Sequence, residues 1–130
     1  MDERLDRTTG ELDARWVAVA GTKELRRARC KVVNGPIGDV AVFWNDGEPR
    51  AMANICIHRE RELSRGTIFN GRVICPGHQW AFDVATGFCA ERDRTQPIFE
   101  VLVIDDVVLV DPSTPVNGAE MPTHRGDGAT

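Results

Sequence analysis

Two short Cys-His pairs constrain this chain more than any other feature of its sequence. The first pair is Cys56-Ile57-His58, and the second is Cys75-Pro76-Gly77-His78. Two thiolates and two imidazoles form the ligand set of a [2Fe–2S] cluster in which Cys binds one iron and His binds the other. Because neutral imidazoles replace two anionic thiolates, such a cluster accepts an electron more readily than a four-Cys cluster. The predicted metal ligands are therefore Cys56, His58, Cys75 and His78.

A structural zinc site is the alternative for the same residues, because two Cys and two His also bind Zn²⁺. Zinc sites usually pair Cys with Cys and His with His, whereas each Cys of this chain is closely followed by a His. Pro76-Gly77 inside the second pair suits a tight turn that directs both ligands to one side. We favour the iron–sulfur interpretation and keep a zinc-stabilised, non-redox binding module as the remote alternative.

The residues around the two pairs resemble the Rieske family. The shared pattern is Cys-x-His, then Leu63-Ser64-x-Gly66, then Cys-Pro-x-His-x-Trp-x-Phe-Asp, and finally Thr86-Gly87. The resemblance extends roughly from Trp16 to Asp111. It implies an all-β fold, a Rieske-type antiparallel β-sandwich with a small cluster-binding subdomain made of two ligand loops.

The resemblance also implies how the four ligands divide between the two irons. Cys56 and Cys75 would bind the inner iron. His58 and His78 would bind the outer iron, which lies nearer the solvent. In this interpretation the cluster performs the chemistry, so no residue is predicted to be catalytic in its own right.

Short apolar segments separated by turn residues predict β-structure independently of the resemblance. Turn signals at 45–47, 70–71 and 105–106 predict hairpins, residues 22–25 are expected to form a turn or brief helix, and 88–90 are expected to return alongside 79–84. The expected strands are 16–20, 29–33, 39–44, 49–54, 67–69, 72–74, 79–84, 88–90, 98–104 and 107–110.

The expected domain organisation is a polar N-terminal arm at 1–14, a Rieske domain at 15–111 with its cluster-binding subdomain at about 54–90, and a flexible tail at 112–130.

Length and charge exclude several classes of partner. The chain has 130 residues and a net charge of −4, with no long basic run, so we expect neither nucleic acid nor an anionic membrane surface as a partner. No apolar segment is long enough to span a membrane. The first residues lack the apolar core of an export signal. We therefore expect a cytoplasmic protein, unlike the membrane-anchored or exported Rieske subunits of respiratory chains.

The second ligand loop predicts a low reduction potential. High-potential members of the family carry Ser and Tyr where this chain has Trp80 and Phe82, and their hydroxyls donate hydrogen bonds that stabilise the reduced cluster. The chain contains no Tyr at all. Those members also join the two loops by a disulfide between positions that correspond to Arg61 and Gly77, which cannot form that bond.

Several residues outside the ligand set have weaker predictions. Cys30 is expected to be a small core residue, and a disulfide between Cys30 and Cys89 is not expected in a reducing compartment. Trp80 is expected to pack in the core, and Asp83 to form hydrogen bonds in the Thr86-Gly87 turn.

The charged segment of the first ligand loop has two interpretations that we weigh evenly. It forms either a docking rim for redox partners or a solvated loop with internal ion pairs. Its residues are Arg59, Glu60, Arg61, Glu62 and Arg65.

Two functions follow from these observations. The leading one is a soluble ferredoxin that carries one electron from a flavin reductase to a terminal oxygenase of the ring-hydroxylating type. The alternative is a small Rieske subunit of a larger oxidoreductase such as assimilatory nitrite reductase. The terminal oxygenase itself is excluded by length, because it needs a second domain with a 2-His-1-carboxylate iron site.

Overall fold

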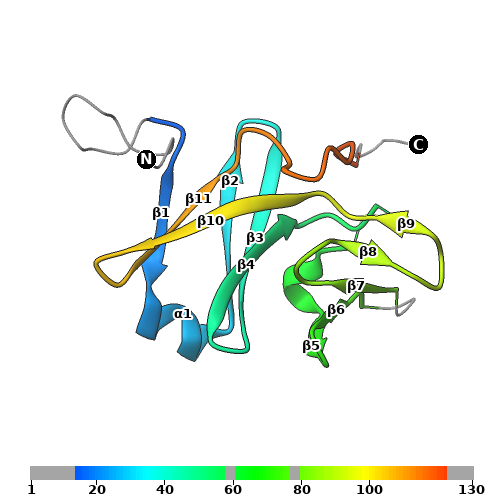
Figure 1. The fold of residues 1–130 in the computed structure, drawn as a ribbon, viewed down its shortest axis with the longest axis horizontal. Coiled ribbons are helices and arrows are strands. Elements are labelled where there is room, and N and C mark those ends of the chain that lie inside the picture. The colour runs from blue at the N-terminus through cyan, green and yellow to red at the C-terminus, as the bar shows by residue number, and fades with distance from the viewer. Residues whose placement is uncertain (1–13, 58–60, 77–79, 123–130) are drawn as a thin grey trace.

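A six-stranded antiparallel sheet forms the larger part of the molecule (Figure 1). The computed structural model describes residues 14–57, 61–76 and 80–122. The strand order in this sheet is β1-β11-β10-β4-β3-β2. Its strands are β1 (Val17–Gly21), β2 (Cys30–Gly35), β3 (Gly38–Asn45), β4 (Glu48–Ala53), β10 (Ile98–Ile104) and β11 (Val107–Asp111).

The two halves of this sheet enclose an apolar core. Only the first residues of β10 pair with β4, where Ile98 lies opposite Met52 and Phe99 lies opposite Ala51, while the rest of β10 pairs with β11. Side chains at alternate positions of a strand point to the same face, so each strand contributes every second residue to the core. The buried residues of this core are Leu25, Val40, Val42, Ala51, Ala53, Phe99, Val108 and Val110.

One short helix, α1 (Thr22–Ala28), connects β1 to β2 within the described residues. It anchors itself through Leu25, which is fully buried, and ends at Arg29, whose φ of 75° stops the helix. The sequence predicted a turn or brief helix at 22–25, and the helix continues to Ala28. Along the described part of the chain, no helix has the length and apolar character of a membrane span.

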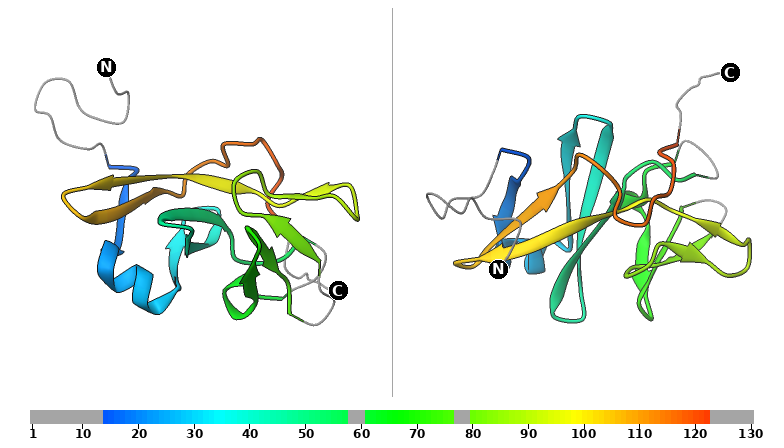
Figure 2. Two further views of the ribbon diagram at one scale, coloured as in Figure 1. Left: turned by 60° about the horizontal axis from the view of Figure 1, so that its bottom comes forward. Right: turned by 45° about the horizontal axis from the view of Figure 1, so that its top comes forward.

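A smaller unit is inserted between β4 and β10 and carries both ligand loops (Figure 2). It contains a three-stranded antiparallel sheet in the order β5-β6-β7 and a separate two-stranded pair, β8-β9. Its elements are the 3₁₀ helix η1 (Leu63–Arg65) and the strands β5 (Thr67–Phe69), β6 (Arg72–Ile74), β7 (Ala81–Asp83), β8 (Phe88–Cys89) and β9 (Arg94–Thr95).

Residues 88–89 return beside β7 as expected, but the backbone ladder of β8 forms with β9 and not with β7. Local bonds in the turn after β7 explain the difference. The Gly87 N–H donates to the Asp83 carbonyl at 2.7 Å, and the Phe88 N–H donates to the Thr86 hydroxyl at 3.2 Å. These two donors are therefore not available to a β7–β8 ladder, and β8 pairs with residues 94–95 instead.

The hairpin turns predicted from the sequence are confirmed. Asp46-Gly47, Asn70-Gly71 and Asp105-Asp106 each have two residues with positive φ, which is the requirement of a type I′ turn. The predicted all-β fold of antiparallel sheets is confirmed as well, since every named strand pairing is antiparallel.

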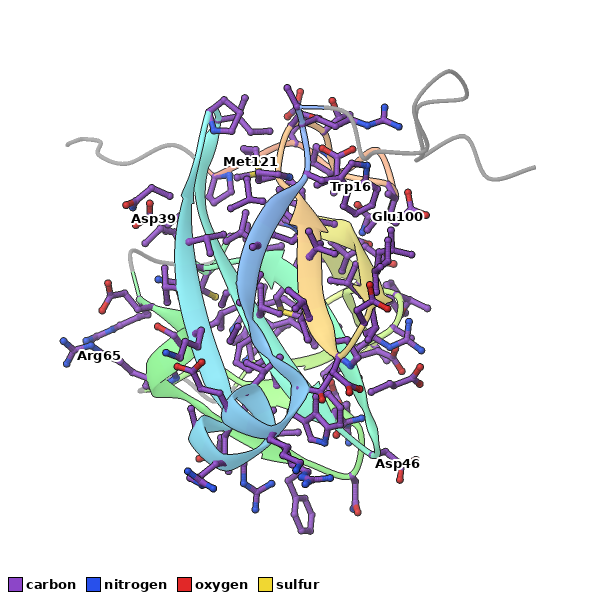
Figure 3. The ribbon with its side chains drawn as sticks, turned by 90° about the vertical axis from the view of Figure 1, so that its left-hand side faces the viewer. Trp16, Asp39, Asp46, Arg65, Glu100 and Met121 are labelled. Atoms are coloured by element: carbon purple, nitrogen blue, oxygen red, sulfur yellow. The ribbon has the colours of Figure 1, made fainter. Side chains whose placement is uncertain are left out.

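The chain beyond β11 lies against the domain as far as it is described. The Val116 N–H donates to the Ile98 carbonyl at 2.8 Å, and Met121 packs against the core of the large sheet. Figure 3 shows Met121 at the same end of that sheet as Trp16, away from the turn at Asp46. The tail expected at 112–130 therefore begins with a segment bonded to the domain. Residues 123–130, like 1–13 of the predicted arm, lie outside the described residues.

Candidate metal centre

Strand β4 leads the chain into the first ligand loop. The Asn54 N–H donates to the Asp39 carbonyl at 2.9 Å, and the Cys56 N–H donates to the Arg61 carbonyl at 2.8 Å. A bridge between Ile55 and Glu62 closes the base of the loop. Cys56 is 1% exposed, so its sulfur lies inside the protein.

The second ligand loop repeats this geometry. Cys75 follows directly after β6, is 0% exposed, and donates its N–H to the Trp80 carbonyl at 2.7 Å. In both loops the backbone N–H of the predicted Cys ligand thus bonds to the carbonyl five positions further along the chain. Each loop is held at its base by strand-like hydrogen bonds, which fixes where its Cys points.

The two predicted Cys ligands meet in the interior. The Cys75 thiol is hydrogen-bonded to Cys56, and burial, with this contact as a lesser cause, raises the pKa of Cys75 to about 12. Burial disfavours the thiolate form of this pair, and a bound metal ion would stabilise that form. Two adjacent buried thiols are a donor set that suits iron bound through sulfur.

Both predicted His ligands lie outside the described residues. So do Arg59, Glu60 and Gly77, to which the sequence also assigned roles. Among the residues that the structure does describe, no cluster of three or more metal-binding side chains occurs. The structure therefore places Cys56 and Cys75 together and describes the chain on either side of both His.

An apolar shell surrounds the two sulfurs. Trp80 and Phe82 pack in it with ring centroids 6.3 Å apart, and the Arg92 guanidinium lies 5.2 Å from the Trp80 ring, which confirms the packing role predicted for Trp80. The buried members of the cluster are Ala41, Phe43, Met52, Cys56, Leu63, Val73, Cys75, Trp80, Phe82, Val84 and Cys89.

The two remaining cysteines are free thiols. Cys89 is buried in the shell, with its sulfur 3.7 Å from the Glu91 carboxylate. Cys30 is half-buried and packs against the same shell, in agreement with its predicted core role. The disulfide that the sequence disfavoured between these two residues is absent.

Ion pairing is present in the described part of the charged segment. Arg65 bonds to Glu62 at 2.7 Å, yet 79% of the Arg65 side chain is exposed, and Figure 3 shows it projecting from the molecule. The Arg65–Glu62 pair supports the interpretation of internal ion pairs for these two residues. An exposed pair of this kind contributes little to stability.

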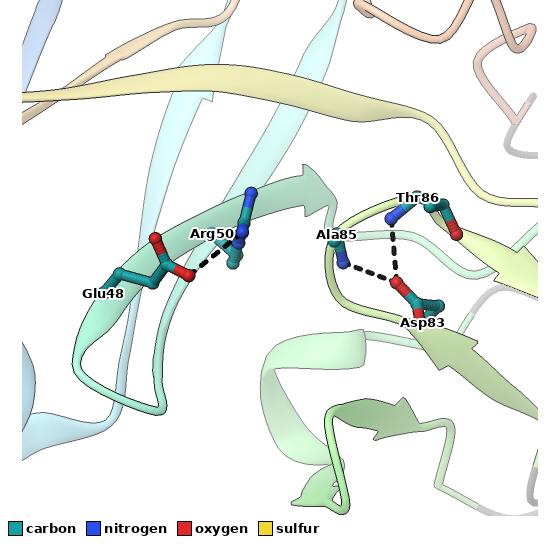
Figure 4. Close-up of polar contacts among 5 residues, drawn as sticks. All are labelled: Glu48, Arg50, Asp83, Ala85 and Thr86. Carbon is teal, nitrogen blue, oxygen red and sulfur yellow. Dashed lines mark hydrogen bonds and ion pairs between the residues drawn. The ribbon is translucent and has the colours of Figure 1, made fainter.

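The turn after β7 forms as the sequence predicted (Figure 4). One Asp83 carboxylate oxygen accepts the N–H of Ala85 at 2.8 Å and the N–H of Thr86 at 2.9 Å. Figure 4 also shows the surface pair Arg50–Glu48, 3.0 Å apart, on β4. The Asp83 bonds fix the end of the strand that follows the second ligand loop.

Two buried polar residues hold the first loop and were missed by the sequence analysis. The Asn54 side-chain oxygen accepts the Ser64 N–H at 2.9 Å, and Gln96 bonds to three backbone groups around Cys56. Asn54 lies two residues before Cys56, and this position was the only feature of the sequence that could have indicated its role. Gln96 is far away in sequence, and no local pattern marks it.

The family model of the Rieske [2Fe–2S] domain matches residues 15–107. The chain belongs to the Rieske family. Its cofactor is accordingly a [2Fe–2S] cluster, and its antiparallel sheets with an inserted loop-bearing unit are the Rieske fold.

Relatives of this Rieske protein include both short ferredoxins and long oxygenases. It is 35% identical over 73 residues to the anthranilate 1,2-dioxygenase ferredoxin subunit of Burkholderia cepacia, covering 55% of this chain and 68% of that one. It is 34% identical over 86 residues to the 4beta-methylsterol monooxygenase of Methylococcus capsulatus, covering 65% of this chain and only 23% of that protein. This Rieske chain therefore spans less than a quarter of that oxygenase.

The Rieske protein also matches a solved chain from the complex of reduced oxygenase and oxidized ferredoxin in carbazole 1,9a-dioxygenase. The TM-score is 0.71 at 25% sequence identity, and the match covers 80% of this chain and 99% of that one. The match therefore includes nearly the whole of that solved chain and most of this one.

Proposed function

We propose that this Rieske protein carries single electrons through a [2Fe–2S] cluster bound by Cys56, His58, Cys75 and His78. The observation that supports the proposal is the meeting of the Cys56 and Cys75 thiols at the bases of two similarly built loops. Each of these Cys is followed by a His two or three positions later. The cluster, when bound, supplies a centre that accepts and releases one electron.

The protein's own residues protect and orient this centre. Trp80, Phe82 and Leu63 exclude water from the sulfur side, and exclusion of water limits loss of iron and sulfide. The backbone bonds of the two Cys fix the loop bases before the metal binds. Rigid loops keep the geometry similar in both oxidation states, which favours rapid electron transfer.

The proposed physiological role is the ferredoxin component of a ring-hydroxylating oxygenase system in the cytoplasm. A flavin reductase is the proposed donor and an oxygenase the proposed acceptor. Relatives named as dioxygenase ferredoxins, and a match over 99% of a chain from an oxygenase–ferredoxin complex, support this role. A small-subunit role in a larger oxidoreductase is distinguished by size-exclusion chromatography, because a subunit co-elutes with its large partner and a carrier elutes alone.

We further propose that the cluster has a low potential, toward the lower end of about −150 to +300 mV. Trp80 and Phe82 belong to the shell around the two Cys and carry no hydroxyl. The main donors to sulfur are then backbone N–H groups. A redox titration with a midpoint well above zero millivolts contradicts this proposal.

A matched pair of cysteine variants tests the ligand assignment. Cys75→Ser should abolish the visible spectrum and the acid-labile sulfide, whereas Cys89→Ser, which alters an equally buried thiol of the same shell, should retain both. Iron and sulfide are measured on protein purified anaerobically, followed by reduction with dithionite. A folded, colourless wild-type protein that contains zinc would refute the electron-carrier proposal. It would support the zinc-stabilised binding module instead.

A further inference from the structure

Gln96 is a fully buried polar side chain at a distance in sequence from either ligand pair. Its Nε2 donates to the carbonyls of Ala53 at 2.9 Å and Ile55 at 2.7 Å. Its Oε1 accepts the N–H of Ile57 at 3.0 Å. All three partners are backbone groups of the segment that ends β4 and enters the first ligand loop. One side chain therefore forms hydrogen bonds with the backbone of that segment on both sides of Cys56.

The backbone of Gln96 is attached to the turn that follows the second ligand loop. Its N–H donates to the Gly87 carbonyl at 2.8 Å. A Cβ at Gly87 would overlap the Gln96 carbonyl oxygen, so this glycine permits the close approach. Gln96 thus links the turn beyond β7 to the entry of the first loop, although these two segments are far apart in the sequence.

Asn117 holds Gln96 from the other side. Its Nδ2 donates to the carbonyls of Gln96 at 3.0 Å and Thr86 at 3.1 Å. Asn117 lies beyond residues 15–107, which the family model matches. The segment after β11 therefore adds a support to the ligand loops that lies outside the matched domain.

We propose that Gln96, held by Asn117, is a positioning residue for the cluster. It fixes the first ligand loop relative to the second and keeps the Ile57 N–H from donating to a cluster sulfur. The inference rests on the proposed ligands Cys56 and His58, because Ile57 lies between them.

The Ile57 amide gives this role an electronic consequence. A backbone N–H that donates to sulfur stabilises the reduced, more negative cluster and raises its potential. The Ile57 N–H donates to the Gln96 side chain, so it does not donate a hydrogen bond to the cluster. Gln96 thereby contributes to a low potential as well as to a rigid loop.

Gln96→Met tests the proposal, because Met has a similar unbranched shape and removes both hydrogen-bonding groups. We expect a higher midpoint potential, an altered electron paramagnetic resonance spectrum of the reduced protein, and loss of the cluster about tenfold faster. Three backbone groups, one buried and two part-buried, lose their partner in this variant. Val108→Ala is the control. Val108 is fully buried in the core of the large sheet, so its truncation should weaken the fold while leaving the potential and spectrum unchanged.

An unchanged or lower potential in the loaded Gln96→Met protein, or a shift of equal size in Val108→Ala, would overturn the proposal. If Gln96→Met does not fold, Asn117→Ala is measured instead, and it should lose the cluster faster and shift the potential upward by a smaller amount. Wild-type values for both properties in Asn117→Ala would also overturn it. A wild-type protein without a [2Fe–2S] spectrum would refute the ligand assignment itself, which is a distinct result.

Discussion

Gly87 provides a sharp test of how the fold supports the metal centre. It has a φ of +81°, and an added Cβ would overlap the carbonyl oxygen of Gln96, with the Ile98 side chain 3.1 Å away. Gly87→Ala therefore combines a backbone penalty with a collision against a buried backbone group. The residue that must move, Gln96, is the one that holds the first ligand loop.

The magnitude follows from these two contributions. A non-glycine residue in the left-handed region costs about 1–2 kcal/mol. Relief of the overlap lengthens the Gln96–Gly87 bond at 2.8 Å and the Gly87–Asp83 bond at 2.7 Å, at a net cost of about 0.5–1.5 kcal/mol for each. The expected total is about 2–5 kcal/mol, reduced by less than about 1 kcal/mol because Ala restricts the unfolded chain.

Gly47→Ala is the matched control. Gly47 has a φ of +82°, and nothing lies within 4 Å of its added Cβ. This variant should therefore lose only the backbone contribution of about 1–2 kcal/mol. The difference between the two variants isolates the collision at Gln96, since their backbone conformations are nearly the same.

The assay is anaerobic urea unfolding, followed by far-ultraviolet circular dichroism for the sheets and by visible absorbance for the cluster. Because a bound cofactor breaks two-state behaviour, rates of cluster loss are compared at equal urea as well. Gly87→Ala should release the cluster before the sheets unfold, whereas Gly47→Ala should lose both signals together. Equal destabilisation in the two variants, with coincident signals, would refute the reasoning.

Three further outcomes are expected. Gly66→Ala should weaken cluster retention, because its Cβ would overlap the carbonyl oxygen of Ile74 beside Cys75. The loss is measured as faster bleaching at 25 °C, and a bleaching rate like that of wild type would contradict this packing. Phe82→Tyr should raise the midpoint potential in a redox titration by placing a hydroxyl donor in the shell, and an unchanged value would argue against a donor role at this position. Burial raises the pKa of Cys30 from 9.0 to about 12, so the folded state binds this proton more tightly than the unfolded state, and stability should fall as pH rises from about 9 toward 12. Cys30→Ala should flatten that decline in melting temperature.

Local signals in the sequence were sufficient for most strands and for the hairpin turns, but not for β9 (Arg94–Thr95), where no strand was predicted. Asn70-Gly71 and Asp46-Gly47 have residue types that tolerate positive φ, and they lie between alternating apolar segments, so both hairpins could be predicted from neighbouring residues alone. The strand with which residues 88–90 pair could not be predicted in this way. It depends on whether the turn bonds of Asp83 and Thr86 compete successfully with a strand ladder.

The alternation of Cys and His in both pairs predicted the cofactor, with zinc as the remaining alternative, and it named Cys56 and Cys75 as partners before any geometry was known. The sequence also determined the β-rich class through the spacing of its apolar residues. Only the tertiary structure decided that Gln96 and Asn117 support the ligand loops. The physical reason is that a ligand motif and a turn are encoded by adjacent residues, whereas the partners of a buried amide are selected by which distant backbone groups the folded chain leaves within its reach.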